Sequence, residues 1–332
     1  MKKIINDPDK VVQDMIKGFV AAYPNDVKQL PNTTGIVRKE APFSNKVGLV
    51  SGGGSGHEPA HAGYVGQGLL DAAVAGEVFT SPTPDQLIEA IKAVDGGAGV
   101  FLIIKNYTGD ILNFEMAAEL AEAEGIEVDK VVVNDDVAVE DSSFTSGRRG
   151  IAGTVFVHKI AGAKAEQGAS LQDVKQTAQK VVANVRSMGV ALSSCTVPAA
   201  GKPSFELADD EMEIGIGIHG EPGIERKQIG SADDIAAELT KKILEDNKLT
   251  KNDDVAVMVN GLGSTPEMEL YIVNGKVQEL LAEKGINVYK TFVGEYMTSL
   301  EMAGCSVTFL KLDHELKELL DAESNAPAFR AK

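Results

Sequence analysis

Short runs rich in β-branched residues alternate with amphipathic stretches along most of this 332-residue chain. The strand-like runs of the first half cover residues 46–50, 70–76, 99–105 and 130–134. An amphipathic stretch follows over 170–188, and strand or helix patterns recur at 211–220, 234–247 and 255–273. Such alternation is typical of mainly parallel or mixed sheets that are covered by helices. The sequence therefore predicts an α/β protein.

The length of the chain predicts two domains, because a single hydrophobic core stops growing at about 250–300 residues. Gly189 follows the stretch 170–188 and is expected to end its helix. We therefore expect an N-terminal α/β domain over residues 1–188, with a glycine loop and Asp110, and a C-terminal α/β domain over residues 189–332, with His219. Each is expected to be a mainly parallel or mixed sheet flanked by helices.

The charge of the chain argues against a nucleic-acid or membrane partner. The formal net charge is -17, and the lysines and arginines are scattered rather than gathered in a stripe. The sequence has no apolar run of the roughly 18 residues that a membrane helix needs, and no apolar segment typical of a signal peptide follows the basic start. We therefore expect a cytoplasmic protein in which Cys195 and Cys305 are buried, reduced thiols.

The run SGGGSGHEPAHAGYVG at residues 51–66 contains HEPAH, which matches the H-E-x-x-H pattern of zinc peptidases. That pattern binds zinc only in the middle of a helix, where both histidines face the metal. Here glycines precede His57, Pro59 favours a first turn, and Gln67 stands where a third histidine ligand would be needed. The sequence therefore argues against a metal site.

The same run also departs from the common nucleotide motifs. A G-x-G-x-x-G pattern that starts at Gly52 or Gly54 reaches His57 or Pro59 in place of its last glycine. We expect a glycine loop between a strand and a helix, in which the amides of residues 53–56, including Gly54, Ser55 and Gly56, approach a small, oxygen-rich ligand. A tight turn without a ligand is the alternative.

Two further residues are expected at the carboxyl ends of strands. Asp110 follows the run that ends at Lys105, and it could be a helix N-cap or a general base. His219 ends the stretch EMEIGIGIHG, where a lone histidine is more often structural. His158 and His314 have no distinctive surroundings in the sequence.

The segments SGGGSGHEPAHAGYVG, IIKNYTGDILNFEMA and IGIGIHGEPGIER, taken together, resemble the dihydroxyacetone-binding subunit of dihydroxyacetone kinases of the phosphotransferase-dependent branch. Their order and spacing match over essentially the whole chain. The resemblance implies two different α/β domains and a homodimer. It also implies a transferase that phosphorylates an alcohol group in glycerol metabolism.

The resemblance also implies roles for individual residues. His219 would add to the substrate ketone and form a hemiaminal, and His57 would hydrogen-bond the substrate and handle a proton. Asp110 would be the base for the hydroxyl that is phosphorylated. Gly54 and Lys105 would contact substrate oxygens. A neutral imidazole is a suitable nucleophile near pH 7, and only a carbonyl can accept it.

No cofactor is expected on this chain itself. The sequence carries no nucleotide motif, and its last residues are AESNAPAFRAK. The resemblance therefore implies a separate, nucleotide-bearing kinase subunit that holds ADP or ATP and Mg. Phosphate would come ultimately from phosphoenolpyruvate. Arg148 and Arg149 could contact that partner, although a solvated loop is the simpler interpretation. A non-enzymatic dihydroxyacetone sensor that co-activates a transcription factor is the alternative function.

Overall fold

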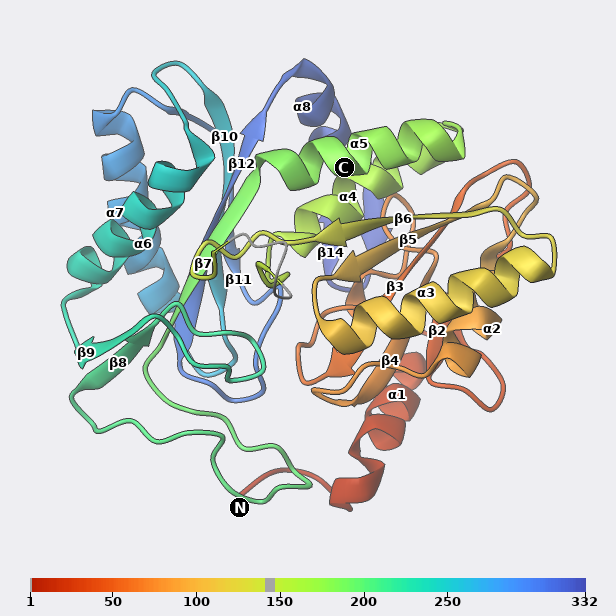
Figure 1. Cartoon of the computed structure of the whole chain (residues 1–332), viewed down its shortest axis with the longest axis horizontal. Helices are drawn as coiled ribbons and strands as arrows, with labels where there is room; N and C mark the ends of the chain where they lie inside the picture. The colour runs from red at the N-terminus through yellow and green to blue at the C-terminus, as the bar shows by residue number, and fades with distance from the viewer. Residues whose placement is uncertain (1, 141–146) are drawn as a thin grey trace.

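The structure is a computed structural model that describes residues 2–140 and 147–332. The described residues form two six-stranded sheets, which lie side by side with helices on their faces (Figure 1). This arrangement confirms the predicted fold class of two α/β units with mixed sheets. No helix in the described ranges is both long enough and apolar enough to cross a membrane.

The first sheet has the strand order β1-β2-β4-β3-β5-β6. Strands β4, β3, β5 and β6 are parallel, whereas β2 pairs antiparallel with β4 and with β1 at one edge. The strands are β1 (Val27–Gln29), β2 (Gly35–Arg38), β3 (Gly48–Ser55), β4 (Ala72–Val78), β5 (Val100–Lys105) and β6 (Val128–Val133). The helices of this region are η1 (Pro8–Lys10), α1 (Val11–Ala22), η2 (Ala62–Tyr64), α2 (Pro84–Val94) and α3 (Thr108–Ala123).

The glycine run forms the end of strand β3. The prediction that these glycines form a loop is therefore wrong. Gly52 pairs with Val74 and Gly54 with Gly76 of β4. A Cβ atom on Gly52 would lie 2.4 Å from the Val74 carbonyl oxygen, and one on Gly54 would lie 2.6 Å from the Thr80 nitrogen. These glycines are therefore needed because neighbouring backbone approaches the strand closely.

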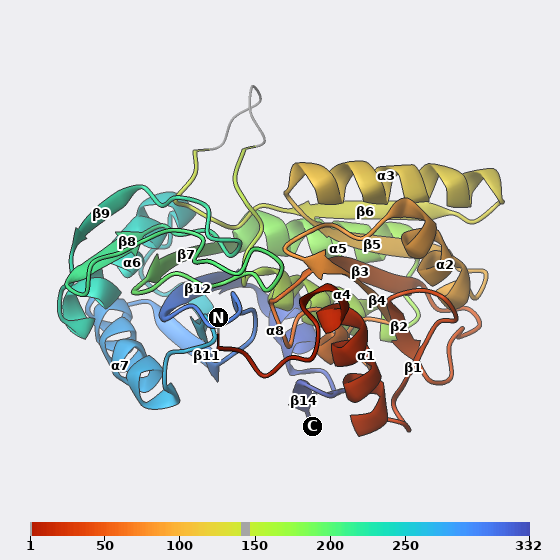
Figure 2. The same ribbon diagram turned by 90° about the horizontal axis from the view of Figure 1, so that it is seen from below.

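The second sheet has the order β11-β10-β12-β7-β8-β9. Its β10–β11 pair is parallel, and the four other pairs in the described part of the chain are antiparallel. The strands are β7 (Val185–Ala191), β8 (Glu211–Ile214), β9 (Glu225–Gln228), β10 (Asp254–Gly261), β11 (Asn287–Gly294) and β12 (Gly304–Leu312). Helices α6 (Ala232–Asn247) and α7 (Glu267–Glu283) cover one face (Figure 2).

A group of elements near the first sheet's inner edge connects the two sheets. It consists of α4 (Thr154–Glu166), α5 (Leu171–Asn184), α8 (His314–Asp321), β13 (Ser324–Ala326) and β14 (Phe329–Ala331). Helix α4 is buried on nearly every side, between β3, β5, α5 and α8. Its polar side chains therefore need internal partners. Lys159, for example, donates hydrogen bonds to the carbonyl oxygens of Leu319 and Ala322 at 2.9 and 2.7 Å.

Three local expectations differ from the structure. The helix predicted over 170–188 ends at Asn184, and Gly189 lies inside β7 because the chain there pairs with β12. Strand β8 ends at Ile214, five residues before His219. Helix α3 begins at Thr108 with Tyr107 as its N-cap, so Asp110 lies in the first turn and is not the cap. The boundary predicted after residue 188 falls within β7, and the two-domain division stays a prediction.

Candidate active site

The first sheet places three of the predicted residues at one edge. Strands β3 and β5 are parallel, so their carboxyl ends, at Ser55 and Lys105, lie at the same edge. His57 follows β3 by two residues, and Asp110 lies in the first turn of α3 after β5. The expected position of these residues at the carboxyl ends of strands is therefore confirmed, and their roles stay predictions.

His219 comes to this edge from the second sheet. It lies in the loop after β8, and its ring centroid is 4.8 Å from that of His57, 5.2 Å from Phe79 and 4.5 Å from Tyr107. All three rings meet the His219 ring edge to face. The site therefore lies between the two sheets, with histidines from both.

Glu221 orients His219. The Nδ1 atom of His219 lies 3.0 Å from Oε1 of Glu221, and the His219 backbone N–H donates to Oε2 at 2.9 Å. Burial opposes ionisation of Glu221, but the hydrogen bond and the charge of His219 outweigh it and lower the pKa of Glu221 to about 2. A carboxylate at Nδ1 holds a proton on that nitrogen, which leaves the Nε2 lone pair for chemistry. The His219 side chain is 18% exposed, so a small ligand can reach it.

His57 is fully buried and has a fixed tautomer. Its Nδ1 lies 2.8 Å from the Thr298 carbonyl oxygen, which can only accept, so Nδ1 carries the proton. Burial, followed by the nearby His219 and Lys105, lowers the pKa of His57 well below its usual value, although the Thr298 hydrogen bond opposes the shift. Nε2 of this neutral ring has no hydrogen-bond partner among the described residues. It is therefore available as an acceptor.

Lys105 is a buried cation between an acid and an imidazole. Its Nζ atom lies 3.8 Å from Oδ2 of Asp110 and 2.8 Å from Nε2 of His61. Burial lowers the pKa of Lys105, and the Asp110 carboxylate opposes that shift. A Cβ atom on Gly53 would lie 2.5 Å from Nζ and 3.7 Å from Oδ2 of Asp110. Gly53 therefore lets the strand pack directly on this charged pair.

The two histidines of HEPAH have different partners. Residues 57–61 form turns rather than a helix, so the rings do not share the face that a zinc peptidase needs. His57 contacts His219, whereas His61 Nδ1 lies 2.9 Å from Nε2 of His158 on α4. Within the described ranges, no three histidine, cysteine, aspartate or glutamate side chains cluster as metal ligands would.

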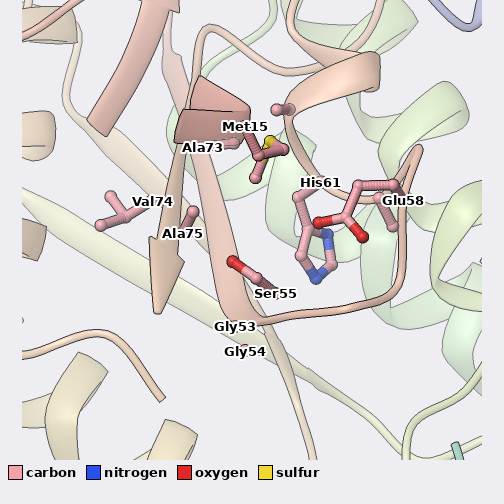
Figure 3. A pocket seen from close by; sticks show the side chains of 11 residues that line it. Met15, Gly53, Gly54, Ser55, Glu58, His61, Ala73, Val74 and Ala75 are labelled. Carbon is pink, nitrogen blue, oxygen red and sulfur yellow. The ribbon is translucent and has the colours of Figure 1, made fainter. Parts of the chain in front are cut away.

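Figure 3 shows His61 and Glu58 on the turn that follows β3, beside a small cavity that Gly53, Gly54 and Ser55 also line. The cavity has a volume of about 10 Å³, which is room for a single water molecule. It is too small for a three-carbon ligand. This cavity is therefore not the binding site for a ligand of that size.

The other residues predicted to bind ligand already have partners in this structure. The Ser55 hydroxyl donates to the Gly76 carbonyl oxygen at 2.7 Å. The Gly56 N–H donates to the Glu58 carboxylate at 3.1 and 3.2 Å. Of the predicted set, Ser55 and Gly56 therefore shape the turn, and their contact with a ligand stays a prediction, as does that of Gly54.

The segment between β11 and β12 supports both histidines of the site. The Thr298 carbonyl accepts from His57, and the Ser299 hydroxyl donates to the Ile218 carbonyl oxygen at 2.6 Å, one residue before His219. Leu300 N–H also donates to the Gly56 carbonyl oxygen at 2.7 Å. Sequence reasoning missed this segment, because its contacts with residues 56–57 and 218 span long distances along the chain.

Sequence reasoning missed several other residues of the site. Glu221 had a usable signal, since a carboxylate two residues after a histidine is well placed to orient it. Phe79 and Tyr107 had none, because their roles depend on which face of His219 they cover. His158, which has no distinctive surroundings in the sequence, lies beside His61. Arg148 and Arg149 pair with Asp246 and Asp136, so both are held within this chain.

Comparisons with known proteins identify relatives of this chain. A family model described as Dak1 domain matches residues 17–328. The chain is 59% identical over 315 residues to the "PTS-dependent dihydroxyacetone kinase 1, dihydroxyacetone-binding subunit DhaK" of Listeria innocua, covering 95% of each. It is 46% identical over 353 residues to the corresponding "PEP-dependent" subunit of Escherichia coli, covering 99% of each.

Solved structures give the same result for the fold. A "dihydroxyacetone kinase operon co-activator" superposes with a TM-score of 0.91 at 38% identity, covering 98% of this chain and 99% of that one. The native dihydroxyacetone kinase of C. freundii also has a TM-score of 0.91, at 37% identity, and covers 99% of this chain and 60% of that longer chain.

Proposed function

Because this chain belongs to the Dak1 domain family, we propose that it is the dihydroxyacetone-binding subunit of a dihydroxyacetone kinase. The observation that carries this proposal is the convergence of His219, His57 and the Lys105–Asp110 pair on the space between the two sheets. The arrangement supplies a nucleophile, an acceptor and a base in one place. It suits a small ketone that also carries a hydroxyl group.

We propose that Nε2 of His219 adds to the ketone carbon of dihydroxyacetone and forms a hemiaminal. The nitrogen lone pair makes the new N–C bond, and the carbonyl π electrons move to oxygen, which takes up a proton from solvent. Glu221, which lies 3.0 Å from Nδ1, balances the positive charge that develops on the ring. Glycerol has no carbonyl group and would not be captured.

His57 and Asp110 would then act on the hydroxyl groups. The low pKa of His57 favours its neutral form, so its unpartnered Nε2 suits an acceptor of a substrate O–H better than a donor. Asp110 would take the proton from the hydroxyl that is phosphorylated, and the ammonium of Lys105 would stabilise the negative charge that develops.

The phosphoryl donor is proposed to lie on another protein. Phosphoryl transfer depends mainly on positioning and on neutralising charge, so a nucleotide-bearing kinase subunit with ADP or ATP and Mg can supply the donor while this chain holds the acceptor. The relatives named "PTS-dependent" and "PEP-dependent" support phosphoenolpyruvate as the ultimate source. We also propose that this subunit is a homodimer, that it is cytoplasmic and that it acts in glycerol metabolism.

A second candidate is a sensor that binds dihydroxyacetone without phosphorylating it. The similarity to an operon co-activator, with a TM-score of 0.91, favours this alternative specifically. A sensor needs the capture by His219 but has no use for a base at the hydroxyl. Asp110 beside Lys105 therefore supports the kinase subunit.

The test combines this chain with dihydroxyacetone, the nucleotide-bearing subunit and the phosphoenolpyruvate-dependent relay proteins, and measures phosphorylated product. We expect turnover in the full mixture and none when this chain meets ATP alone. Native mass spectrometry of the chain with dihydroxyacetone, without any reducing agent, should show an adduct that is absent with glycerol. Capture of the ketone with no turnover in the full mixture would favour the sensor. The absence of both capture and turnover would contradict both candidates.

A further inference from the structure

We propose that His61 and His158 form a neutral two-histidine support that orients the ammonium group of Lys105, and that His61 is thereby a positioning residue for the reaction at Asp110. The inference rests on the proposed function for its link to phosphorylation. Its structural part stands on the contacts among Lys105, His61 and His158.

The hydrogen-bond directions follow from the chemistry of the groups. An ammonium can only donate, so Lys105 donates to Nε2 of His61 at 2.8 Å. The neutral His61 ring then carries its proton on Nδ1 and donates it to Nε2 of His158 at 2.9 Å. His158 in turn carries its proton on Nδ1, which has no hydrogen-bond partner among the described residues. The series of hydrogen bonds therefore runs in one direction, away from Lys105, and ends at a nitrogen inside the protein.

Burial keeps both rings neutral. His158 is 0% exposed and His61 is 6% exposed. Burial and the nearby Lys105 lower the pKa of His158 to about 3, and the same two causes, with His158 and His57, lower the pKa of His61 well below its usual value. The rings thus accept and pass on a hydrogen bond without adding charge at neutral pH.

A neutral acceptor suits this position better than a carboxylate would. Lys105 already has one acid nearby, Asp110 at 3.8 Å. A second carboxylate in place of His61 would cancel the remaining positive charge, whereas an imidazole fixes one N–H of the ammonium and leaves its charge for Asp110 and for a substrate oxygen. The series ends at a buried nitrogen, so positioning explains it better than proton transfer to solvent does.

The position of His61 also separates it from direct ligand contact. The cavity beside it, about 10 Å³ in volume, holds no more than a water molecule. Among the described residues, the ionisable groups that interact with Lys105 include Asp110 on α3, His57 and His61 on the turn after β3, and His158 on α4. Of these, the structure gives His61 the shortest contact with Nζ.

The first test uses the wild-type chain without substrate. Nitrogen-15 NMR of labelled histidine should show both His61 and His158 neutral at pH 7, with the proton on Nδ1 and Nε2 unprotonated. A proton on Nε2 of His61 would overturn the proposal, whatever the enzyme does. This measurement also stands if the proposed function fails, because it requires neither capture nor turnover.

The second test compares His61→Leu with His61→Gln. Glutamine can accept from Lys105 with its oxygen and donate to His158 with its amide, whereas leucine can do neither. For His61→Leu we expect kcat in the full mixture to fall about tenfold to a hundredfold with a smaller change in KM, since misplaced groups cost rates of that order. Glutamine should restore most of kcat. Equal losses in both variants would contradict the proposal.

The third test follows the ionisation of Lys105 directly. Burial already lowers the pKa of Lys105, so losing the imidazole acceptor should lower it further. Carbon-13 NMR titration at Cε should therefore show Lys105 losing its proton at a lower pH in His61→Leu than in the wild type or His61→Gln. An unchanged titration in a folded His61→Leu variant would overturn the proposal. If His61→Leu does not fold, His158→Leu, which removes the acceptor of the His61 Nδ1 proton, should show a smaller decrease, and an unchanged titration there would also overturn the proposal.

Discussion

The two sides of the candidate site hold their nitrogen groups in opposite ways. On the second-sheet side, a carboxylate holds an imidazole, with Glu221 at 3.0 Å from Nδ1 of His219. On the first-sheet side, an imidazole holds an ammonium, with His61 at 2.8 Å from Nζ of Lys105. In the proposed mechanism, a carboxylate partner raises the electron density of the ring that attacks, whereas a neutral partner preserves the charge of the cation that stabilises an anion. The partner's charge thus follows what each group has to do.

The largest effect is expected from removing the nucleophile. His219→Ala should abolish both the adduct with dihydroxyacetone and the phosphorylated product, because it removes the Nε2 atom that is proposed to attack the ketone. Native mass spectrometry and the coupled turnover assay measure the two results. An adduct that survived in His219→Ala would show that the nucleophile lies elsewhere, Lys105 included.

Asp110→Asn should separate turnover from capture of the ketone, because the two depend on different sides of the candidate site. Turnover is expected to fall about 10²- to 10⁴-fold, because asparagine cannot take the proton from the hydroxyl. The adduct on His219 should persist, since capture depends on the other side. Full turnover in this variant would remove Asp110 from its role as the base, and loss of the adduct would show that the two sides are not independent.

Glu221→Gln is expected to have an intermediate effect. It keeps a hydrogen-bond acceptor near Nδ1 of His219 but removes the charge, so the rate of adduct formation should fall about 10- to 100-fold, as for other groups that orient a functional histidine. Stopped-flow mass or fluorescence measurements of capture would show this. A normal rate would mean that position alone, without charge, is sufficient.

The His219–Glu221 pair also predicts a dependence of stability on pH. The pKa of Glu221 is about 2 in the folded chain against an ordinary value of 4.5. Because the folded value is the lower one, the stabilisation from this pair is present above pH 4.5 and is lost as the pH falls toward 2. Urea unfolding between pH 4.5 and pH 2 should show a smaller loss of stability in Glu221→Gln than in the wild type.

The smallest effect is expected for the segment that supports both sides. Ser299→Ala removes the hydroxyl that donates to the Ile218 carbonyl oxygen at 2.6 Å, and it leaves that buried oxygen without this donor. Stability should fall by about 1–3 kcal/mol, with a modest loss of capture. Ser264→Ala is a matched control, because its hydroxyl also donates to a backbone carbonyl, that of Glu301, but at an exposed position. Equal losses of stability in the two variants would contradict the assigned role.

Local patterns determined much of this protein. The alternation of strand and helix signals was sufficient for the α/β class. Lys105 at the end of one parallel strand, with His57 and Asp110 soon after strand ends, was sufficient to place all three at one edge. Parallel strands bring their carboxyl ends together whatever the details of packing. The three segments around His57, Asp110 and His219 were distinctive enough to indicate the family.

Only the tertiary structure decided how the site is completed. His219 arrives from a loop of the second sheet, Thr298 and Ser299 come from a segment between β11 and β12, and His158 from a helix buried beneath the first sheet. Whether glycines form a loop or the end of a strand depends on the backbone that packs against them, which no local pattern contains. The orientation of a side chain is set by partners that lie far away in sequence. The sequence by itself therefore determined the fold class, the family and the residues proposed to carry the chemistry, and the packing of the two sheets decided how each of these residues is held.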